Sequence, residues 1–259
     1  MNIAMLSYHT CPLAILGGKN TGGMNVYVRE LTRFLGRVGV HVDVFTRSMD
    51  EHIPQVSHDL GYFNRVVHIP AGPEFYLPKS HLSSYTEEFT ERIIAFSRRK
   101  NIKYDVVHAH YWLSGVAGGK LKAAWGAPML QMFHTLGLVK QKIGRTPEER
   151  EGQYRIDGER MVMDASDIII AATQSEQNAL VKLYDVHPSK VKIIPPGVNI
   201  HHFYPIPKDE AKEAIEISPD ERMALFVGRI EPLKGVDTLL KAMAILTERC
   251  QSFTCPNYL

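Results

Sequence analysis

The sequence predicts an α/β protein, with a doubly wound, parallel, Rossmann-like sheet followed by an incomplete second domain. Short apolar runs typical of buried strands alternate with longer amphipathic segments typical of helices over residues 1–194. Gly22 and Gly23 lie between the first apolar run and the first amphipathic segment, where a loop after a strand opens a helix. The alternating pattern begins again at residue 224, after a charged segment flanked by prolines.

The predicted strands of the first domain are short and mostly apolar, as expected for strands buried on both faces of a parallel sheet. They are residues 2–6, 40–46, 65–69, 105–109, 128–133, 168–172 and 191–194. Pro195, Pro196 and Gly197 close the last of them. Strands that alternate with helices in this way favour parallel pairing through right-handed crossovers.

Helices are predicted between the strands, at residues 24–38, 82–100, 116–121, 148–163 and 174–184. In the first, apolar residues recur at the spacing of one helix face. The second ends in the basic cluster Arg98-Arg99-Lys100, which suits the C-terminus of a helix dipole. Residues 74–84 and 136–150 are polar, and we predict loops there, the second of them mobile.

Residues 1–204 form the predicted first domain, and residues 205–259 a linker with the start of a second domain. The linker, 205–218, should carry a short helix, and a strand at 224–227 should precede a helix at 236–246. One strand and one helix cannot bury both of their faces. We therefore expect the sequence to be truncated, or diverted by a changed reading frame, soon after Arg249.

The composition excludes several classes of function. The apolar fraction of 44% is ordinary for a globular protein, and a net charge of +2 gives no electrostatic reason to expect nucleic acid or an anionic membrane as partner. Cys11, Cys250 and Cys255 have neither the spacing of metal ligands nor that of a disulfide framework. No apolar stretch reaches membrane length and no signal peptide is present, so we predict a cytoplasmic protein without a transmembrane segment.

The Gly22-Gly23 pair is a candidate phosphate site. Glycines let backbone N–H groups approach an anion, and the N-terminus of the following helix adds partial positive charge. The pattern is neither a P-loop nor G-x-G-x-x-G, and such a pair alone is more often a plain turn. Its place after the first strand of an α/β chain favours the functional interpretation.

Ligands of doubly wound sheets bind beyond the carboxyl ends of the strands, and three histidines are predicted there. His108 and His110 alternate on one strand and so share a face, and His134 ends the next strand. They could form a zinc site of a hydrolase, although no H-E-x-x-H motif or cysteine pair supports one. The alternative is a mixture of core and loop histidines, and we predict no metal.

Four cationic residues are candidates for contact with an anionic ligand. Arg155 lies in a charged helical run, which is typical of a solvated face with i,i+4 pairs, although it could reach an anionic ligand at the strand ends. Lys79 is a loop lysine that is either solvated or able to close over a site. Arg229 and Lys234 flank a tight loop after a predicted strand, where they could clamp a diphosphate.

Five ordered motifs resemble those of the retaining glycosyltransferases of family 4, which have the GT-B fold. They are Gly22-Gly23-Met24-Asn25-Val26-Tyr27-Val28, His108-Ala109-His110-Tyr111-Trp112, Phe133-His134-Thr135-Leu136, Pro195-Pro196-Gly197-Val198-Asn199 and Gly228-Arg229-Ile230-Glu231-Pro232-Leu233-Lys234-Gly235. By pattern, the D-inositol-3-phosphate glycosyltransferases and the sucrose-phosphate synthases are the most similar subgroups. The resemblance extends to about residue 246.

The resemblance implies a role for each motif. In this family two Rossmann-like domains face each other, and the first binds the acceptor while the second binds the nucleotide sugar. Gly22 and Gly23 would then meet the donor diphosphate, which Arg229 and Lys234 would hold, and His134 would lie beside the transferred sugar. The residues implied to form the acceptor site are Asn25, Lys79, Tyr111, Thr135 and Arg155. His134, Arg229 and Lys234 are the implied catalytic residues.

The function implied is transfer of a hexosyl group from a nucleotide sugar, such as a UDP-sugar, to a phosphorylated polyol or sugar acceptor. The resemblance implies no cofactor and no requirement for a divalent metal ion. It leaves open whether the protein forms a homodimer. The family's later donor-binding part, with its E-x7-E motif, is absent from the sequence. We therefore expect this chain alone to be inactive, and a non-catalytic sugar-phosphate-binding module is the alternative.

Overall fold

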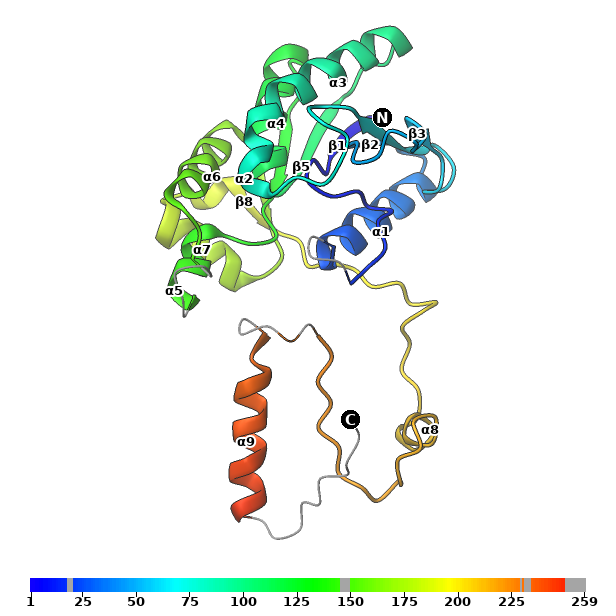
Figure 1. Cartoon of the computed structure of the whole chain (residues 1–259), viewed down its shortest axis with the longest axis vertical. Helices are drawn as coiled ribbons and strands as arrows, with labels where there is room; N and C mark the ends of the chain where they lie inside the picture. The colour runs from blue at the N-terminus through cyan, green and yellow to red at the C-terminus, as the bar shows by residue number, and fades with distance from the viewer. Residues whose placement is uncertain (18–20, 145–149, 229, 231–233, 250–259) are drawn as a thin grey trace. The chain divides into compact units, whose positions relative to one another are not determined.

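The computed structural model describes residues 1–17, 21–144, 150–228, 230 and 234–249 (Figure 1). The chain divides into two compact units, Met1–Gly197 and Val198–Leu259. The boundary predicted at residues 204 and 205 stays a prediction. Among the described residues, no helix combines the length and apolar character needed to cross a membrane.

The first unit is built on an eight-stranded sheet of order β3-β4-β2-β1-β5-β6-β7-β8. Every neighbouring pair is parallel except β3 and β4. The strands are β1 (Asn2–Leu6), β2 (His41–Arg47), β3 (Val56–Ser57), β4 (Asn64–Ile69), β5 (Val106–His110), β6 (Met129–Met132), β7 (Ile168–Ala171) and β8 (Val191–Ile193). The predicted α/β fold is confirmed, and β3 was missed because two residues carry no periodic signal.

Helices cover both faces of the sheet (Figure 1). They are α1 (Gly23–Arg37), α2 (Lys79–Leu82), α3 (Thr86–Lys100), α4 (Trp112–Trp125), α5 (Gly137–Ile143), α6 (Gln153–Ala165) and α7 (Gln174–Tyr184), with 3₁₀ turns η1 (Ser83–Tyr85) and η3 (Pro188–Lys190). Side chains alternate between the faces of a strand. Met5 of β1 therefore packs with Val28 of α1, whereas Leu6 belongs to the larger core with Phe89 of α3 and Leu113 of α4.

Two predicted loops contain helices. Residues 74–84 include α2 and the start of η1, and residues 136–150 include α5. The α5 segment has a weak local helix signal, and tertiary contacts decide its structure, because its first N–H, that of Gly137, donates to the buried carboxylate of Glu159. Residues 145–149, which also fall in that predicted mobile loop, lie outside the described residues.

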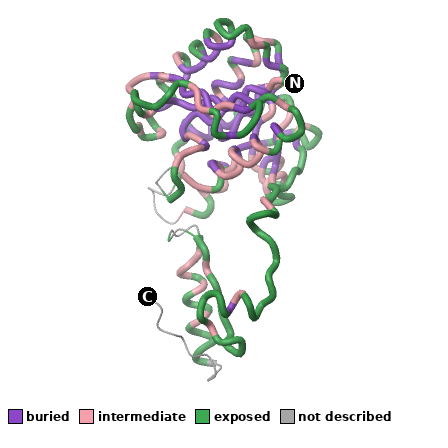
Figure 2. Tube along the Cα trace, turned by 90° about the vertical axis from the view of Figure 1, so that its right-hand side faces the viewer, coloured by how far each residue is buried: buried purple, intermediate pink, exposed green. Residues whose placement is uncertain are grey.

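The second unit contains α8 (Lys208–Glu213) and α9 (Val236–Arg249), both predicted. Residues 224–227 are described but form no strand, so that prediction is wrong. A strand exists only through hydrogen bonds to a neighbour, and none of the described strands pairs with this segment. Figure 2 shows the second unit mostly exposed. Of the apolar face of α9, which we expected to be exposed, Leu240 and Leu246 are exposed, whereas Val236, Leu239 and Met243 are half-buried.

A candidate acceptor site at the carboxyl edge of the sheet

Four residues predicted for the acceptor site come together where β5 and β6 end. Tyr111 follows β5 and Thr135 lies just beyond β6, while Lys79 begins α2 and Arg155 lies on α6. The Lys79 Nζ is 5.2 Å from the centre of the Tyr111 ring, and the Arg155 Cζ is 5.0 Å from it. Arg155 Nη2 donates to the Thr135 Oγ1 at 2.9 Å. The structure therefore places two cations beside the Tyr111 ring, and one of them, Arg155, also holds the Thr135 hydroxyl.

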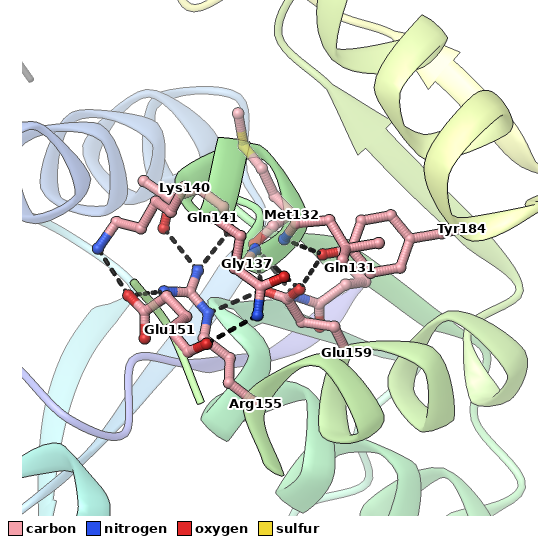
Figure 3. A network of polar contacts seen from close by, with 11 residues as sticks. Gln131, Met132, Gly137, Lys140, Gln141, Glu151, Arg155, Glu159 and Tyr184 are labelled. Atoms are coloured by element: carbon pink, nitrogen blue, oxygen red, sulfur yellow. Dashed lines mark hydrogen bonds and ion pairs between the residues drawn. The ribbon is translucent and has the colours of Figure 1, made fainter. Parts of the chain in front are cut away.

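Arg155 is fully buried, so its interpretation as part of a solvated helix face is wrong. Figure 3 shows the polar network around it. Its Nε donates to Glu159 at 2.9 Å, its Nη1 donates to Glu151, and its Nη2 donates to both the carbonyl and the hydroxyl of Thr135 at 2.9 Å. The charge is tolerated in the interior because two carboxylates pair with it, Glu159 one turn later on α6 and Glu151 just before the helix begins. Arg155 thus fixes the segment that follows β6.

Glu159, which the sequence analysis did not single out, is the second centre of this network (Figure 3). Its carboxylate is fully buried and accepts hydrogen bonds from the Gly137 N–H and from the Tyr184 hydroxyl. The Tyr184 oxygen in turn accepts the Leu138 N–H at 2.9 Å. The spacing of Glu151, Arg155 and Glu159 at i,i+4 was the available signal, but this spacing equally suits a solvated helix face.

Tyr111 is buried and keeps its proton at neutral pH. Burial raises the pKa of its phenol to about 12, against the opposing effect of the Arg155 guanidinium. Its ring also contacts the His9 imidazole, with 4.5 Å between the ring centres. The next residue, Trp112, is buried under α6, where a Cβ at Gly158 would lie 2.6 Å from the Trp112 ring. Only glycine at position 158 allows this approach.

His108 and His110, which are buried, and His134, which is half-buried, form a cluster beside the candidate acceptor residues. The ring centres of His108 and His110 are 4.3 Å apart, and His110 Nδ1 lies 3.0 Å from His134 Nε2. Burial lowers the pKa of His108 to about 4 and that of His134 to about 3, so both imidazoles are neutral at pH 7. No three His, Cys, Asp or Glu side chains among the described residues are placed to hold a metal ion.

The backbone is strained at two residues of this site. Tyr111 has a φ of 74° and His134 has a φ of 61°. Residues other than glycine rarely adopt such positive φ angles. Each conformation costs about 1–3 kcal/mol and persists only where the surroundings impose it. Both residues stand at strand ends, where such strain is typical of functional sites.

The glycine loop opens α1 as predicted. No described atom lies within 4 Å of the place where a Cβ would stand at Gly22 or Gly23, so space is open in front of both. The Asn25 amide donates to the Thr10 hydroxyl and to the Cys11 carbonyl, both at 2.7 Å, and accepts the Gly22 N–H at 3.0 Å. Asn25 therefore ties the loop to the helix, and its predicted contact with the acceptor stays a prediction.

The two residues predicted to clamp the donor diphosphate belong to the second unit. Arg229 lies outside the described residues. Lys234 is described and exposed, directly before the Gly235 turn that precedes α9. Their joint role at a diphosphate stays a prediction.

The fold is that of the Rossmann-like half of a GT-B glycosyltransferase, and the candidate site residues lie at the carboxyl edge of its sheet. The model of a family described as Glycosyltransferase Family 4 matches residues 21–202, and the chain belongs to this family. D-inositol 3-phosphate glycosyltransferase 2 of Catenulispora acidiphila is 40% identical over 248 residues, which cover 95% of this chain and 58% of the relative. The chain thus spans about 58% of that curated relative's length.

Two solved structures illustrate the likeness. Sucrose-phosphate synthase from Thermosynechococcus elongatus has a TM-score of 0.82 and 32% identity, covering 95% of this chain and 60% of its own. HepE of Anabaena, solved in complex with UDP and glucose, has a TM-score of 0.58 and 17% identity, covering 95% of this chain and 58% of its own. The second likeness concerns the fold alone.

Proposed function

We propose that the first unit is the acceptor-binding half of a retaining glycosyltransferase that moves a hexosyl group from a nucleotide sugar to a phosphorylated polyol or sugar. The observation that carries the proposal is the cluster of Lys79, Tyr111, Thr135 and Arg155. An inositol phosphate is the first acceptor to test, because the name of the relative in Catenulispora acidiphila specifies D-inositol 3-phosphate. The nucleotide sugar is the only co-substrate, and no divalent metal ion is required.

A phosphate monoester suits this cluster because it accepts several hydrogen bonds at once. The Thr135 oxygen accepts from Arg155, so its own hydrogen is left to donate. The Tyr111 phenol stays protonated and can donate too. Lys79 supplies a cation beside the ring, and Arg155 contributes positive charge from behind Thr135. In this arrangement Lys79 contacts the phosphate, whereas Arg155 holds the Thr135 hydroxyl.

The donor side of the proposal uses the glycine loop and the second unit. The N-terminus of α1 and the open space at Gly22 and Gly23 suit a diphosphate. Arg229 and Lys234 would add charge-assisted contacts that strengthen as negative charge develops on the leaving diphosphate. His134 would lie beside the transferred sugar.

The test is ligand-dependent stability of this chain. An inositol phosphate at about 100 times its Kd should raise the free energy of unfolding by about 2.7 kcal/mol, measured as a higher Tm, and unphosphorylated inositol should not. Lys79→Gln should weaken binding by at least about tenfold, because it removes a charge-assisted hydrogen bond worth about 1.5–3 kcal/mol. High salt should reduce the shift.

Lys182→Gln is the matched control, because Lys182 is an exposed lysine on α7. It should leave the ligand-induced shift unchanged. Equal stabilisation by inositol and by its phosphate would remove the cluster from the acceptor site, and so would a Lys79→Gln variant that binds like the wild type.

The 259-residue chain alone is expected to transfer no sugar, because it spans only about 58% of the length of its relative from Catenulispora acidiphila. Incubation of the purified chain with a UDP-sugar and an inositol phosphate checks this. Turnover at an ordinary enzymatic rate would contradict it, while phosphate binding without turnover is the expected combination.

A further inference from the structure

We propose that His110 is a positioning residue that fixes His134 as the tautomer protonated at Nδ1, so that His134 offers a hydrogen-bond donor to its ligand. The fixing of the tautomer stands on the geometry of the two histidines. The identity of that ligand as the donor sugar rests on the proposed function.

The two histidines meet because β5 and β6 are neighbours in the sheet. His110, the last residue of β5, pairs in register with Met132 of β6, and His134 follows two residues later. His110 is fully buried, and its Nδ1 lies 3.0 Å from Nε2 of His134. The Tyr27 ring packs edge-on against both imidazoles, with ring centres 5.7 Å and 5.4 Å away. The contact is therefore enclosed on the side of α1 as well.

Each imidazole carries one ring proton at neutral pH, because burial lowers both pKa values. The hydrogen bond then has two possible arrangements. In the first, His110 Nδ1–H donates to a bare Nε2 of His134, whose proton must sit on Nδ1. In the second, His134 Nε2–H donates to a bare Nδ1 of His110, whose proton must sit on Nε2.

The surroundings of His110 Nε2 decide between them. This atom is buried and has no hydrogen-bond partner among the described residues. The second arrangement would bury an N–H group without an acceptor, which is rare in proteins and costs the desolvation of the donor. The first arrangement leaves only a bare nitrogen there. The first arrangement is therefore favoured, and it makes His134 a donor at Nδ1.

The free nitrogen of His134 is the one that a ligand can reach. Nδ1 has no partner among the described residues and is not one of their buried, unsatisfied atoms. As an N–H group it fits a hydroxyl or ring oxygen of a sugar. It has no lone pair with which to take a proton from an attacking hydroxyl. His134 would thus orient the sugar and would not act as a general base through this atom.

The test reads the tautomer directly in the 259-residue chain. In ¹⁵N-labelled protein at neutral pH, long-range ¹H–¹⁵N correlations distinguish protonated from bare ring nitrogens, and His134→Asn assigns the His134 signals. We expect a protonated Nδ1 and a bare Nε2 on His134. A protonated Nε2, or a mixture of the two tautomers, would overturn the proposal.

Substitutions of His110 test whether its ring nitrogen fixes the His134 tautomer or whether His110 only fills space in the core. His110→Asn keeps a donor near the place of Nδ1 and should preserve the tautomer, whereas His110→Leu should give a mixture. His108→Asn is the matched control, since His108 is also a buried histidine of β5 whose own Nε2 has no partner among the described residues. It should leave the His134 tautomer unchanged.

A single Nδ1–H tautomer that persists in His110→Leu would show that His110 does not fix it. If His110→Leu fails to fold, the wild-type and His110→Asn spectra still decide. Failure of sugar transfer in the complete enzyme would remove the proposed function but leave the tautomer result standing.

Discussion

Replacing Arg155 with alanine is expected to lower the free energy of unfolding by about 3–5 kcal/mol, because it leaves the buried Glu159 carboxylate without its cation. The same change frees the Thr135 carbonyl and hydroxyl from their donor. Denaturant unfolding followed by circular dichroism measures the loss. We expect this loss of stability to be one of the two largest among the predictions made for this protein.

Arg160→Ala is the control, because Arg160 is an exposed arginine on the same helix and surface changes are usually within about 0.5 kcal/mol. The double variant Arg155→Met with Glu159→Gln should be less destabilised than the two single losses predict, since it leaves no unpaired charge. If Arg155→Ala were as stable as Arg160→Ala, the ion-pair network would not hold the fold together.

Lowering the pH is expected to destabilise the protein already at pH values well above those at which carboxylates become protonated. His108 and His134 have folded pKa values of about 4 and about 3, and the pKa of His9 and of His110 is also lowered by burial. Below about pH 6.5 these histidines are protonated in the unfolded chain but stay neutral in the folded chain. The free energy of unfolding therefore falls as the pH falls. Between about pH 7 and about pH 5 each of His108 and His134 should cost about 2 kcal/mol.

Denaturant unfolding at several pH values between these limits checks the slope. His108→Asn should flatten the profile, because it removes one of the groups that take up a proton only on unfolding. His52→Gln alters an exposed histidine and should leave the profile unchanged. A wild-type stability that is constant over this range would mean that the buried histidines are already protonated or solvated in the folded protein.

The fold could be predicted from the sequence wherever periodicity was strong. Residues 2–6, 105–109 and 168–172 are short, mostly apolar segments, and each overlaps a strand of the sheet. Strands β1 and β5 are the two central ones, and β7 lies next to the edge strand β8. The prediction failed where distant partners decide the structure. Helix α5 forms against the Glu159 carboxylate, and none of the described strands pairs with residues 224–227. Neither condition can be detected in a local window of sequence.

The site was predicted through its motifs more than through its chemistry. Tyr111 and Thr135 follow strands, so their meeting with Lys79 and Arg155 at one edge agrees with the rule for parallel sheets. The burial of Arg155 could not be foreseen, because a run of charges at i,i+4 spacing is compatible with either face of a helix. The facing of His110 and His134 depends on strand register, which the sequence does not specify across separate crossovers.

The position of Trp112 gives the protein an optical probe of its own site. The sequence has two tryptophans. Trp112 directly follows Tyr111, whose ring lies beside Lys79 and Arg155, and the centres of the Trp112 and Tyr111 rings are 6.3 Å apart. Trp125, at the far end of α4, instead packs on Tyr104 with ring centres 5.0 Å apart. In a Trp125→Phe background, a change in indole emission on adding a phosphorylated ligand would report on occupancy of the proposed acceptor site without any label.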